Sequence, residues 1–322
     1  MANSGELVNY SLRPAKAAER KMLCELARRL GPFSRVETYR YIGFGSIYFA
    51  DFQLFHQSLG ISDMLSIEKD EANEARFEFN KPFRCVELKL GQSNTVLPHL
   101  SWDRRSLLWL DYDGKLDKSV LADLATVCSK VVSGSLLIVS VNVEPDRKPN
   151  ASPEEQDDHR LKIFSEAVGV EKVPLGTARA NLRSGELAKV CRRVINNEIA
   201  RELTIRNGPL LDERKLHFEQ VIHFLYADGA QMLTIGGMFY EERERSLLNA
   251  CGFQQLTFVR GGDQAFTIRA PKLTHKEIRY LNSQLPRVPA TEVILSGVPE
   301  SDVQAYAAIY RYYPSFIEIL AG

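Results

Sequence analysis

Between residues 37 and 143, short apolar runs alternate with amphipathic stretches. The apolar runs are rich in β-branched and aromatic residues and predict strands at 37–45, 63–70, 83–91, 105–114 and 135–143. The stretches between them repeat apolar positions at helical spacing and predict helices at 47–60, 71–80, 94–100 and 118–132. Strands separated by helices of this length are typical of βαβ units, so the pattern predicts an α/β fold with a parallel sheet.

The pattern changes on both sides of this region. An amphipathic helix is expected at 14–30, with Pro14 in its first turn. The polar segment 144–158 is typical of an exposed loop, and 183–206 has the pattern of one long helix. The rest of the chain predicts a hairpin around Asp228-Gly229, a short helix ending before Gly252, two strands around Gly261-Gly262, and a mostly helical tail at 274–322.

Composition narrows the class of protein. Of 322 residues, 44% are hydrophobic and 25% are charged, as in ordinary globular proteins. Lys plus Arg equal Asp plus Glu at 41 each, so no net field favours nucleic acid or an anionic membrane. The chain has no apolar stretch of membrane-spanning length and no signal-peptide pattern at its start. Its five scattered cysteines contain no CxxC pair, which favours reduced thiols and a cytoplasmic location.

The first predicted strand ends in a glycine-rich turn, Gly43-Phe44-Gly45-Ser46, which precedes a helix. Taken alone, such a turn needs only a steric explanation. The second predicted strand, however, ends at Glu68, and a carboxylate there can accept hydrogen bonds from both hydroxyls of a ribose. Because the carboxyl ends of parallel strands meet at one edge of a sheet, the turn and Glu68 together predict a nucleotide-type site.

This series of segments resembles class I S-adenosylmethionine-dependent methyltransferases over 36–145, and again over 241–273. "YIGFGS" stands where that family has its glycine-rich motif, and Glu68 stands at the acid that ends the second strand. "GQSNTVLPHL" resembles the next motif, with Gln92 where Asp is usual, and Asp111 stands at the fourth motif. "LLNACGFQQLTFV" and "QAFTIRAP" resemble the closing helix and antiparallel hairpin. More narrowly, "GFGSIYFADFQLFHQSLGI" resembles a group of bacterial O-methyltransferases.

The resemblance implies a doubly wound, mostly parallel seven-stranded sheet of the Rossmann-like methyltransferase type. It implies a helical segment at 1–35, a methyltransferase domain at 36–273 with a helical insertion at 146–240, and a helical extension at 274–322. It also implies S-adenosylmethionine as cofactor, held by Gly43, Phe44, Gly45, Ser46, Glu68, Gln92 and Asp111. The expected activity is methyl transfer to an oxygen atom of a small molecule or a protein.

Two positions depart from the family. The acid that usually stands two residues before the first glycine is Tyr41 here, and Gln92 is neutral. Two neutral residues weaken attraction for a cationic donor, so a catalytically weak or silent cofactor-binding subunit in a protein complex stays an alternative. Dinucleotide binding is disfavoured because Tyr48 replaces the third glycine of GxGxxG. RNA or DNA methylation is a further alternative, ranked lower because the net charge is zero and no "DPPY"-like motif is present.

Asp111 and Asp113 are the catalytic candidates, because alternate residues of a strand share one face. One interpretation makes Asp111 a contact to donor or substrate and Asp113 a base or metal ligand. The other places Asp113 in a turn and makes Asp117 the N-cap of the next helix. Together with Asn142 and Glu144 they could offer oxygen ligands to Mg²⁺. We favour a site without metal.

The aromatic residues after the turn and the basic residues of 12–21 each allow a functional and a structural interpretation. Phe44 and Tyr48 could face the donor's sulfonium, but Tyr48, Phe52 and Phe55 recur at helical spacing, which favours a core position. The basic residues of 12–21 favour a solvated helix face over phosphate contacts; they are Arg13, Lys16, Arg20 and Lys21.

The expected partners are an acceptor of unknown identity and a protein or second copy of the chain, without a membrane. The surface predicted for a protein partner is the aromatic part of the C-terminal helices, formed by Tyr306, Tyr310, Tyr312, Tyr313 and Phe316.

Overall fold

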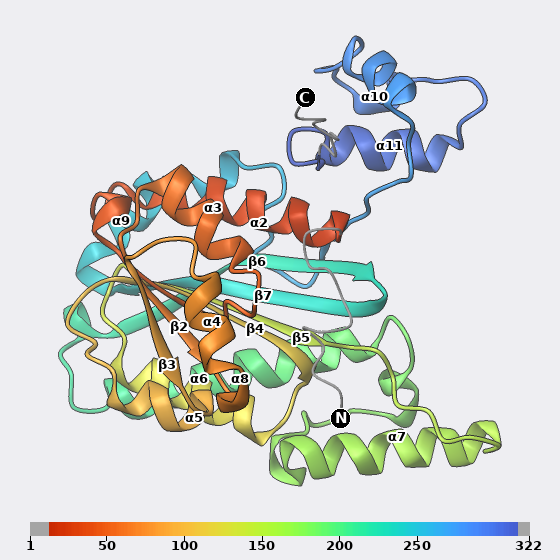
Figure 1. Cartoon of the computed structure of the whole chain (residues 1–322). Helices are drawn as coiled ribbons and strands as arrows, with labels where there is room; N and C mark the ends of the chain where they lie inside the picture. Colours follow the sequence, from red (N-terminus) through yellow and green to blue (C-terminus); the bar gives the residue numbers. More distant parts are fainter. Residues whose placement is uncertain (1–12, 315–322) are drawn as a thin grey trace.

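The computed structural model describes residues 13–314, and its centre is one eight-stranded sheet (Figure 1). The strand order is β3-β2-β1-β4-β5-β7-β6-β8. The strands are β1 (Arg40–Gly43), β2 (Asp63–Glu68), β3 (Val86–Leu90), β4 (Ser106–Lys115), β5 (Leu136–Asn142), β6 (Leu216–Asp228), β7 (Ala230–Glu241) and β8 (Phe266–Ile268). The first five run parallel, which confirms the predicted βαβ series.

The strand order reverses direction at β1, where β2 and β4 pair on opposite sides. In open α/β sheets a ligand binds outside the carboxyl ends of the strands at such a switch point. The antiparallel hairpin of β6 and β7 extends the sheet beyond β5.

Helices cover both faces of the sheet. Their bounds are α2 (Pro14–Ala27), α3 (Ala50–Leu59), α4 (Glu74–Asn80), α5 (Ser93–Val96), α6 (Lys118–Lys130), α7 (Pro153–Val168), α8 (Leu187–Asn207), α9 (Arg245–Ala250), α10 (His275–Asn282) and α11 (Glu300–Ile309).

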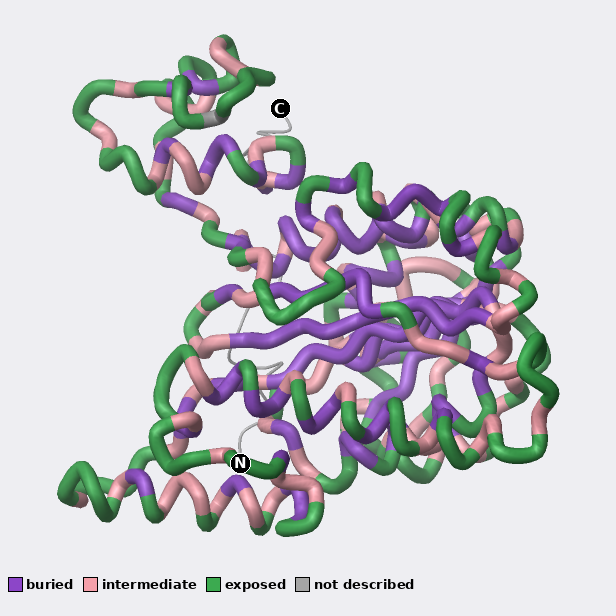
Figure 2. The backbone as a smooth tube through the Cα atoms, turned by 180° about the vertical axis from the view of Figure 1, so that it is seen from behind, coloured by how far each residue is buried: buried purple, intermediate pink, exposed green. Residues whose placement is uncertain are grey.

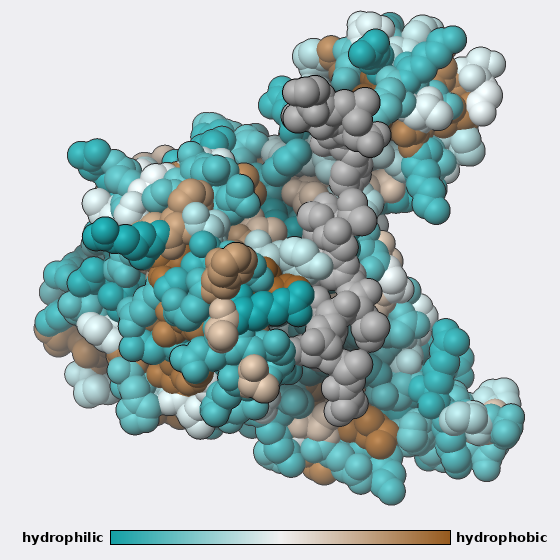
Figure 3. Space-filling model, in the orientation of Figure 1, coloured by the Kyte–Doolittle hydropathy of each residue, from teal (hydrophilic) through white to brown (hydrophobic). Residues whose placement is uncertain are grey.

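Neighbouring strand residues send their side chains to opposite faces, which creates two cores. Tyr41 and Trp109 pack with α2, α3 and α9, whereas Ile42 and Leu108 pack with α6 and α8. The strands are the most continuously buried part of the chain, while α7 and the C-terminal helices are largely exposed (Figure 2). The visible face is mostly hydrophilic, with separate hydrophobic groups on it (Figure 3).

The structure corrects the position of the closing hairpin. We expected it at 253–271, but the hairpin that closes the sheet is formed by β6 and β7. In the later segment only β8 joins the sheet, and it runs parallel to β6. The sheet therefore has eight strands, and the segment predicted as an insertion, 146–240, contains most of two of them.

Two further expectations need revision. The loop predicted at 144–158 ends earlier, because α7 begins at Pro153 behind a capping box formed by Ser152 and Glu155. The C-terminal tail contains α10 and α11, which pack on a small core of their own around Leu281 and Tyr306. Phe316 lies outside the described residues. Within 13–314, no helix is long and apolar enough to cross a bilayer.

Candidate functional site

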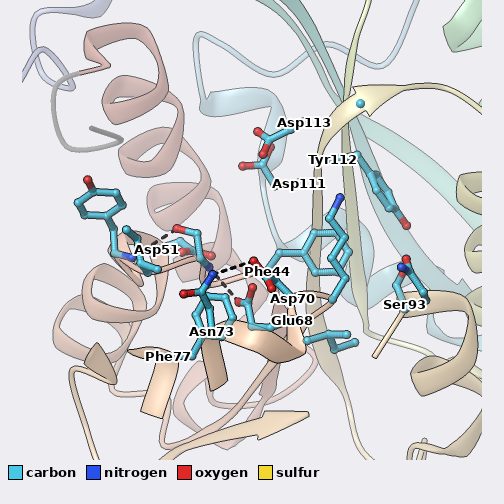
Figure 4. Close-up of a pocket in the computed structure, with 18 of the residues that line it drawn as sticks. Phe44, Asp51, Glu68, Asp70, Asn73, Phe77, Ser93, Asp111, Tyr112 and Asp113 are labelled. Carbon is cyan, nitrogen blue, oxygen red and sulfur yellow. Dashed lines mark hydrogen bonds between the residues drawn. The ribbon is translucent and has the colours of Figure 1, made fainter. Parts of the chain in front are cut away.

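A cavity of about 270 Å³ lies at the carboxyl edge of the sheet, beside the switch point (Figure 4). Four chain segments at the carboxyl ends of the strands β1 to β4 line it: 44–48, 67–70, 91–93 and 111–115. Helices add Asp51 from α3, Phe77 from α4 and Arg20 from α2. Every predicted cofactor or catalytic residue lines this cavity except Gly43.

Glu68, the last residue of β2, holds the glycine-rich turn in place through hydrogen bonds. Its Oε1 accepts hydrogen bonds from the Ser46 backbone N–H at 2.9 Å and from the Ser66 hydroxyl at 2.8 Å. The Ser66 Oγ in turn accepts from the Gly45 N–H at 2.9 Å. Ser46 has a φ of 51°, a left-handed conformation uncommon outside glycine, so these bonds hold the turn in a strained shape. Burial raises the pKa of Glu68 to about 7.

The two glycines of the turn have different reasons to lack a side chain. A Cβ on Gly45 would lie 2.4 Å from the Phe49 ring and 2.9 Å from the Ser66 Oγ. A Cβ on Gly43 would lie 2.6 Å from the Tyr41 hydroxyl oxygen. Gly45 thus makes room for the buried Phe49 ring and the Ser66 hydroxyl, whereas Gly43 makes room for the Tyr41 side chain.

Tyr41 has no carboxyl group of its own, but its hydroxyl group contacts the carboxyl group of Asp51, which lines the cavity. Its buried ring packs edge-on against Phe52 and Phe55, with centroids 4.8 and 4.9 Å away. The Tyr41 hydroxyl donates a hydrogen bond to Asp51, in the first turn of α3. Burial raises the pKa of Asp51, and Arg20 opposes that shift. The sequence patterns did not single out Asp51, although it is the only acidic residue of α3.

Asp111 is held by a cation from the N-terminal helix. Lys16 Nζ lies 2.6 Å from Asp111 Oδ1 and 2.8 Å from Glu19 Oε2, and it donates to the Tyr226 hydroxyl at 3.0 Å. The same ammonium sits 4.4 Å from the centre of the Trp109 ring. Lys16 is 1% exposed, so the expectation of a solvated basic face is wrong for this residue.

A contact with the end of β6 fixes the N-terminus of α2. The carboxylate of Asp228, at the end of β6, accepts from the backbone N–H groups of Ala15 and Lys16 at 3.3 and 2.8 Å. An acid at a helix N-terminus satisfies donors that the helix itself leaves open. This contact places Lys16 over the end of β4.

Asp111 and Asp113 point to one side of β4, and Tyr112 points to the other (Figure 4). Asp113 is exposed, while Asp111 is partly buried. Asp117 is the N-cap of α6, as one interpretation predicted, because its Oδ1 accepts from Ser119 N and Val120 N at 2.9 and 3.0 Å. The two predicted catalytic carboxylates therefore lie at the end of one strand.

The opposite side of the cavity is aromatic and polar. The rings of Phe44 and Tyr112 meet edge-to-face with centroids 5.2 Å apart. The Tyr112 and Ser93 hydroxyls both donate to Asp123, at 2.5 Å each. Gln92 lies beside them, exposed at the rim. Planar aromatic faces next to amide and hydroxyl groups suit a heteroaromatic ring.

Tyr48 departs from the predicted aromatic stripe. Phe52 and Phe55 are fully buried, as expected for core residues. Tyr48 is 38% exposed and lines the cavity. The helical spacing identified a real stripe, but α3 begins at Ala50, so Tyr48 lies outside the helix.

The four oxygen ligands suggested for Mg²⁺ do not line one cavity. Asp111 and Asp113 line the main cavity, whereas Asn142 lines a separate one of about 20 Å³. The Asn142 side-chain oxygen accepts from the backbone N–H of Glu144 at 2.8 Å. Within residues 13–314, no three His, Cys, Asp or Glu side chains are grouped to hold a metal ion.

Comparison with known proteins gives one match over nearly the whole chain. Residues 8–321 match the model of a family described as "Putative O-methyltransferase". No curated protein matches the chain.

The solved structures that resemble this chain do so distantly. The LepI complex with SAM is 10% identical, with 66% of this chain and 46% of that chain covered at a TM-score of 0.38. PigF with SAH is 14% identical, with 70% and 64% covered at a TM-score of 0.34. SAM-bound CalS10, an amino pentose methyltransferase from Micromonospora echinaspora, is 16% identical, with 42% and 52% covered at a TM-score of 0.29. The chain spans about half the length of the first structures that it matches.

Proposed function

The chain belongs to the family described as "Putative O-methyltransferase", and we propose that it transfers a methyl group from S-adenosylmethionine to an oxygen atom of an acceptor. The observation that carries this proposal is Glu68, a buried carboxylate that lines the cavity beside the glycine-rich turn. Both sit at the switch point of the sheet, where α/β folds bind nucleotides.

The cavity fits the adenosyl part of the donor. Glu68 commits Oε1 to the turn, and its second oxygen is the acceptor proposed for the ribose hydroxyls. Phe44 and Tyr112 offer aromatic surface to the adenine, and Gln92 offers an amide that can donate and accept. Gly45 lines the cavity and leaves room for Phe49 and Ser66, which hold the turn in place beside the ligand.

Asp111 and Asp113 face the remaining part of the cavity, where we place the acceptor. When bound, the donor supplies a methyl group that passes to the acceptor oxygen while the C–S electron pair stays on sulfur. Lys16 donates a hydrogen bond to Asp111 Oδ1. The other carboxylate oxygen of Asp111 can therefore orient the acceptor hydroxyl. Asp113 takes the proton that this hydroxyl loses.

The acceptor is a small molecule or a protein, in the cytoplasm, where the five free cysteines stay reduced. The Tyr-rich helices at the C-terminus are the proposed surface for a protein partner or a second copy. The alternative of a silent subunit is motivated by the neutral residues Tyr41 and Gln92. Asp51, which accepts a hydrogen bond from Tyr41 and lines the cavity, provides a carboxyl group in place of the one absent at position 41.

Replacing Asp113 by Asn is expected to lower methyl transfer by about 10²- to 10⁴-fold, because a general base of this kind contributes a factor of that size. Affinity for S-adenosylhomocysteine should stay within about twofold, since we place Asp113 beside the acceptor and not the donor. The assay follows radiolabelled methyl transfer to phenols, carboxylic acids and cell-extract proteins.

The matched control is Asp212→Asn, because Asp212 is an exposed aspartate far along the chain from the cavity residues. Full transfer by Asp113→Asn would remove Asp113 from the mechanism, and no transfer by wild type to any acceptor would contradict the proposed activity.

Donor binding should release a proton below pH 7. Glu68 has its pKa raised to about 7, so at pH 6 most molecules carry the neutral acid. Ribose hydroxyls donate best to the carboxylate, so binding favours the ionised form and lowers that pKa. Affinity for S-adenosylhomocysteine should therefore rise between about pH 5 and 7 and level off above.

Calorimetry at pH 6 in buffers of different ionisation enthalpy measures the protons released, and Glu68→Gln should release none. Proton uptake by wild type would contradict this role.

A further inference from the structure

The outer edge of β3 is an unpaired edge of the sheet. β3 is the first strand in the sheet order, and within residues 13–314 it pairs with β2 alone (Figure 1). The Gly91 N–H donates to the Glu68 carbonyl, so alternate residues before Gly91 also turn their backbone groups toward β2. Leu88 and Leu90 lie between those residues, so their N–H and C=O groups point to the free edge. Such a row of donors and acceptors is a template for another strand.

The two edges of the sheet differ in how they discourage a second chain. β8, at the other edge, has only three residues, and a very short strand offers few groups for pairing. β3 has five residues, contains no proline and pairs with β2 in unbroken register. Its exposed side chains are Glu87 and Lys89, which carry opposite charges. Charges of one sign would repel a second copy of the edge, but this pair does not.

The sequence of β3 is complementary to itself in the antiparallel direction. When two copies pair about Leu88, each Glu87 lies opposite the Lys89 of the other copy, and each Val86 lies opposite Leu90. In this register the two Leu88 residues form a hydrogen-bonded pair, as their outward backbone groups require. The charged residues then form non-hydrogen-bonded pairs, whose Cα atoms lie about 4.5 Å apart. Pairing therefore creates two opposite-charge contacts between the copies.

The other face of this edge offers apolar surface. Leu88 and Leu90 are partly buried and pack against the core that contains Phe77 of α4. Pairing places the two Leu88 side chains beside each other and covers more of both. Helix α4 contacts β3 on this face and carries Phe79, which is 88% exposed. Both the strand and the helix above it thus leave apolar atoms for a second copy to cover.

We propose that two copies of this chain pair through β3 in the antiparallel direction, so that their sheets join into one. The occupant of the edge is a second copy because the order of charges in β3 matches its own reverse. The proposal does not depend on methyl transfer. In the same register, the segment 83–85 of the second copy lies beside 91–93, which line the cavity of the first. The C-terminal helices stay available to a different partner.

The test reverses the two charges of β3, singly and together. Wild type is expected to sediment as a dimer at micromolar concentration. Glu87→Lys and Lys89→Glu each put like charges opposite one another twice per dimer, so each should raise the dimer dissociation constant at least about 100-fold. The double variant Glu87→Lys/Lys89→Glu restores opposite charges and should dimerise within about tenfold of wild type. Analytical ultracentrifugation measures all four chains.

A mixture of the two single variants tests the register itself. Each variant carries one sign of charge at both positions, so the two kinds of chain complement each other but not themselves. They should form a heterodimer although neither forms a homodimer. Glu87 and Lys89 are both exposed, and circular dichroism verifies that each variant is folded. The control is Glu166→Lys on α7, where the acid is 61% exposed, and it should leave the dissociation constant unchanged.

A monomeric wild type would overturn the proposal. A dimer that persists in both single variants would also overturn it, because the contact would then lie on another surface. The same holds if the two single variants are monomeric and stay monomeric when mixed.

Discussion

Replacing Lys16 by Met is expected to lower the free energy of unfolding by about 3–5 kcal/mol, the usual cost of removing one partner from a buried ion pair. The substitution keeps most of the side-chain volume, so packing is a minor part of the loss. What remains is Asp111 and the fully buried Glu19 without their shared cation. Glu19 also accepts a hydrogen bond from Thr234 on β7, so the disturbance reaches the hairpin. Urea unfolding measures the change.

The control for this experiment is Lys162→Met on α7, where the lysine is 73% exposed and its ion pair is long. Surface pairs of this kind contribute between about 0 and 1 kcal/mol. A loss below about 1 kcal/mol for Lys16→Met would mean that Asp111 and Glu19 do not depend on this lysine. The account of how α2 positions Asp111 would then be wrong.

Replacing Glu68 by Ala is expected to weaken binding of S-adenosylhomocysteine at least about a hundredfold. Hydrogen bonds to a charged acceptor contribute about 1.5–3 kcal/mol each, and the variant would lose both of the contacts proposed for the ribose hydroxyls. It also frees the Ser46 N–H and the Ser66 hydroxyl, so the glycine-rich turn loses its attachment to β2. Titration calorimetry measures the affinity.

Two companion variants separate these effects. Glu68→Gln keeps an oxygen acceptor for the turn but removes the charge, so its loss of affinity should be smaller than that of Glu68→Ala. Glu71→Ala, an exposed acid just after the same strand, should bind like wild type. Wild-type affinity in Glu68→Ala would show that the ligand does not use this carboxylate.

The sequence predicted the parallel part of the sheet because each strand there has its own helix beside it in the chain. It also predicted the hairpin around Asp228-Gly229, but it placed the hairpin that closes the sheet at 253–271, because the two later segments have similar apolar patterns. The segment 253–271 buries Phe253 and Phe258 without pairing them in strands, and only the three residues of β8 join the sheet. Apolar spacing predicts burial, but the hydrogen-bonding partner depends on where the chain returns.

In the candidate site too, contacts between residues close in sequence could be predicted, whereas contacts between distant residues could not. The glycine-rich turn and Glu68 are recognisable because a strand, a turn and the next strand follow one another closely. Lys16 and Asp111 are separated by 95 residues, and no spacing rule connects them. Asp51 was hidden for a different reason, because the acid was expected at position 41 and the structure supplies it through the hydroxyl of Tyr41.

The central claim is that the cavity at the switch point is a site for S-adenosylmethionine. Its most direct test is calorimetric titration of S-adenosylmethionine, and then of S-adenosylhomocysteine, into the wild-type chain. The account predicts saturable binding of both ligands, one molecule per chain, competed by 5′-methylthioadenosine. Absence of heat and of competition at millimolar ligand would contradict it, because the cavity would then keep the shape of a nucleotide site without its ligand.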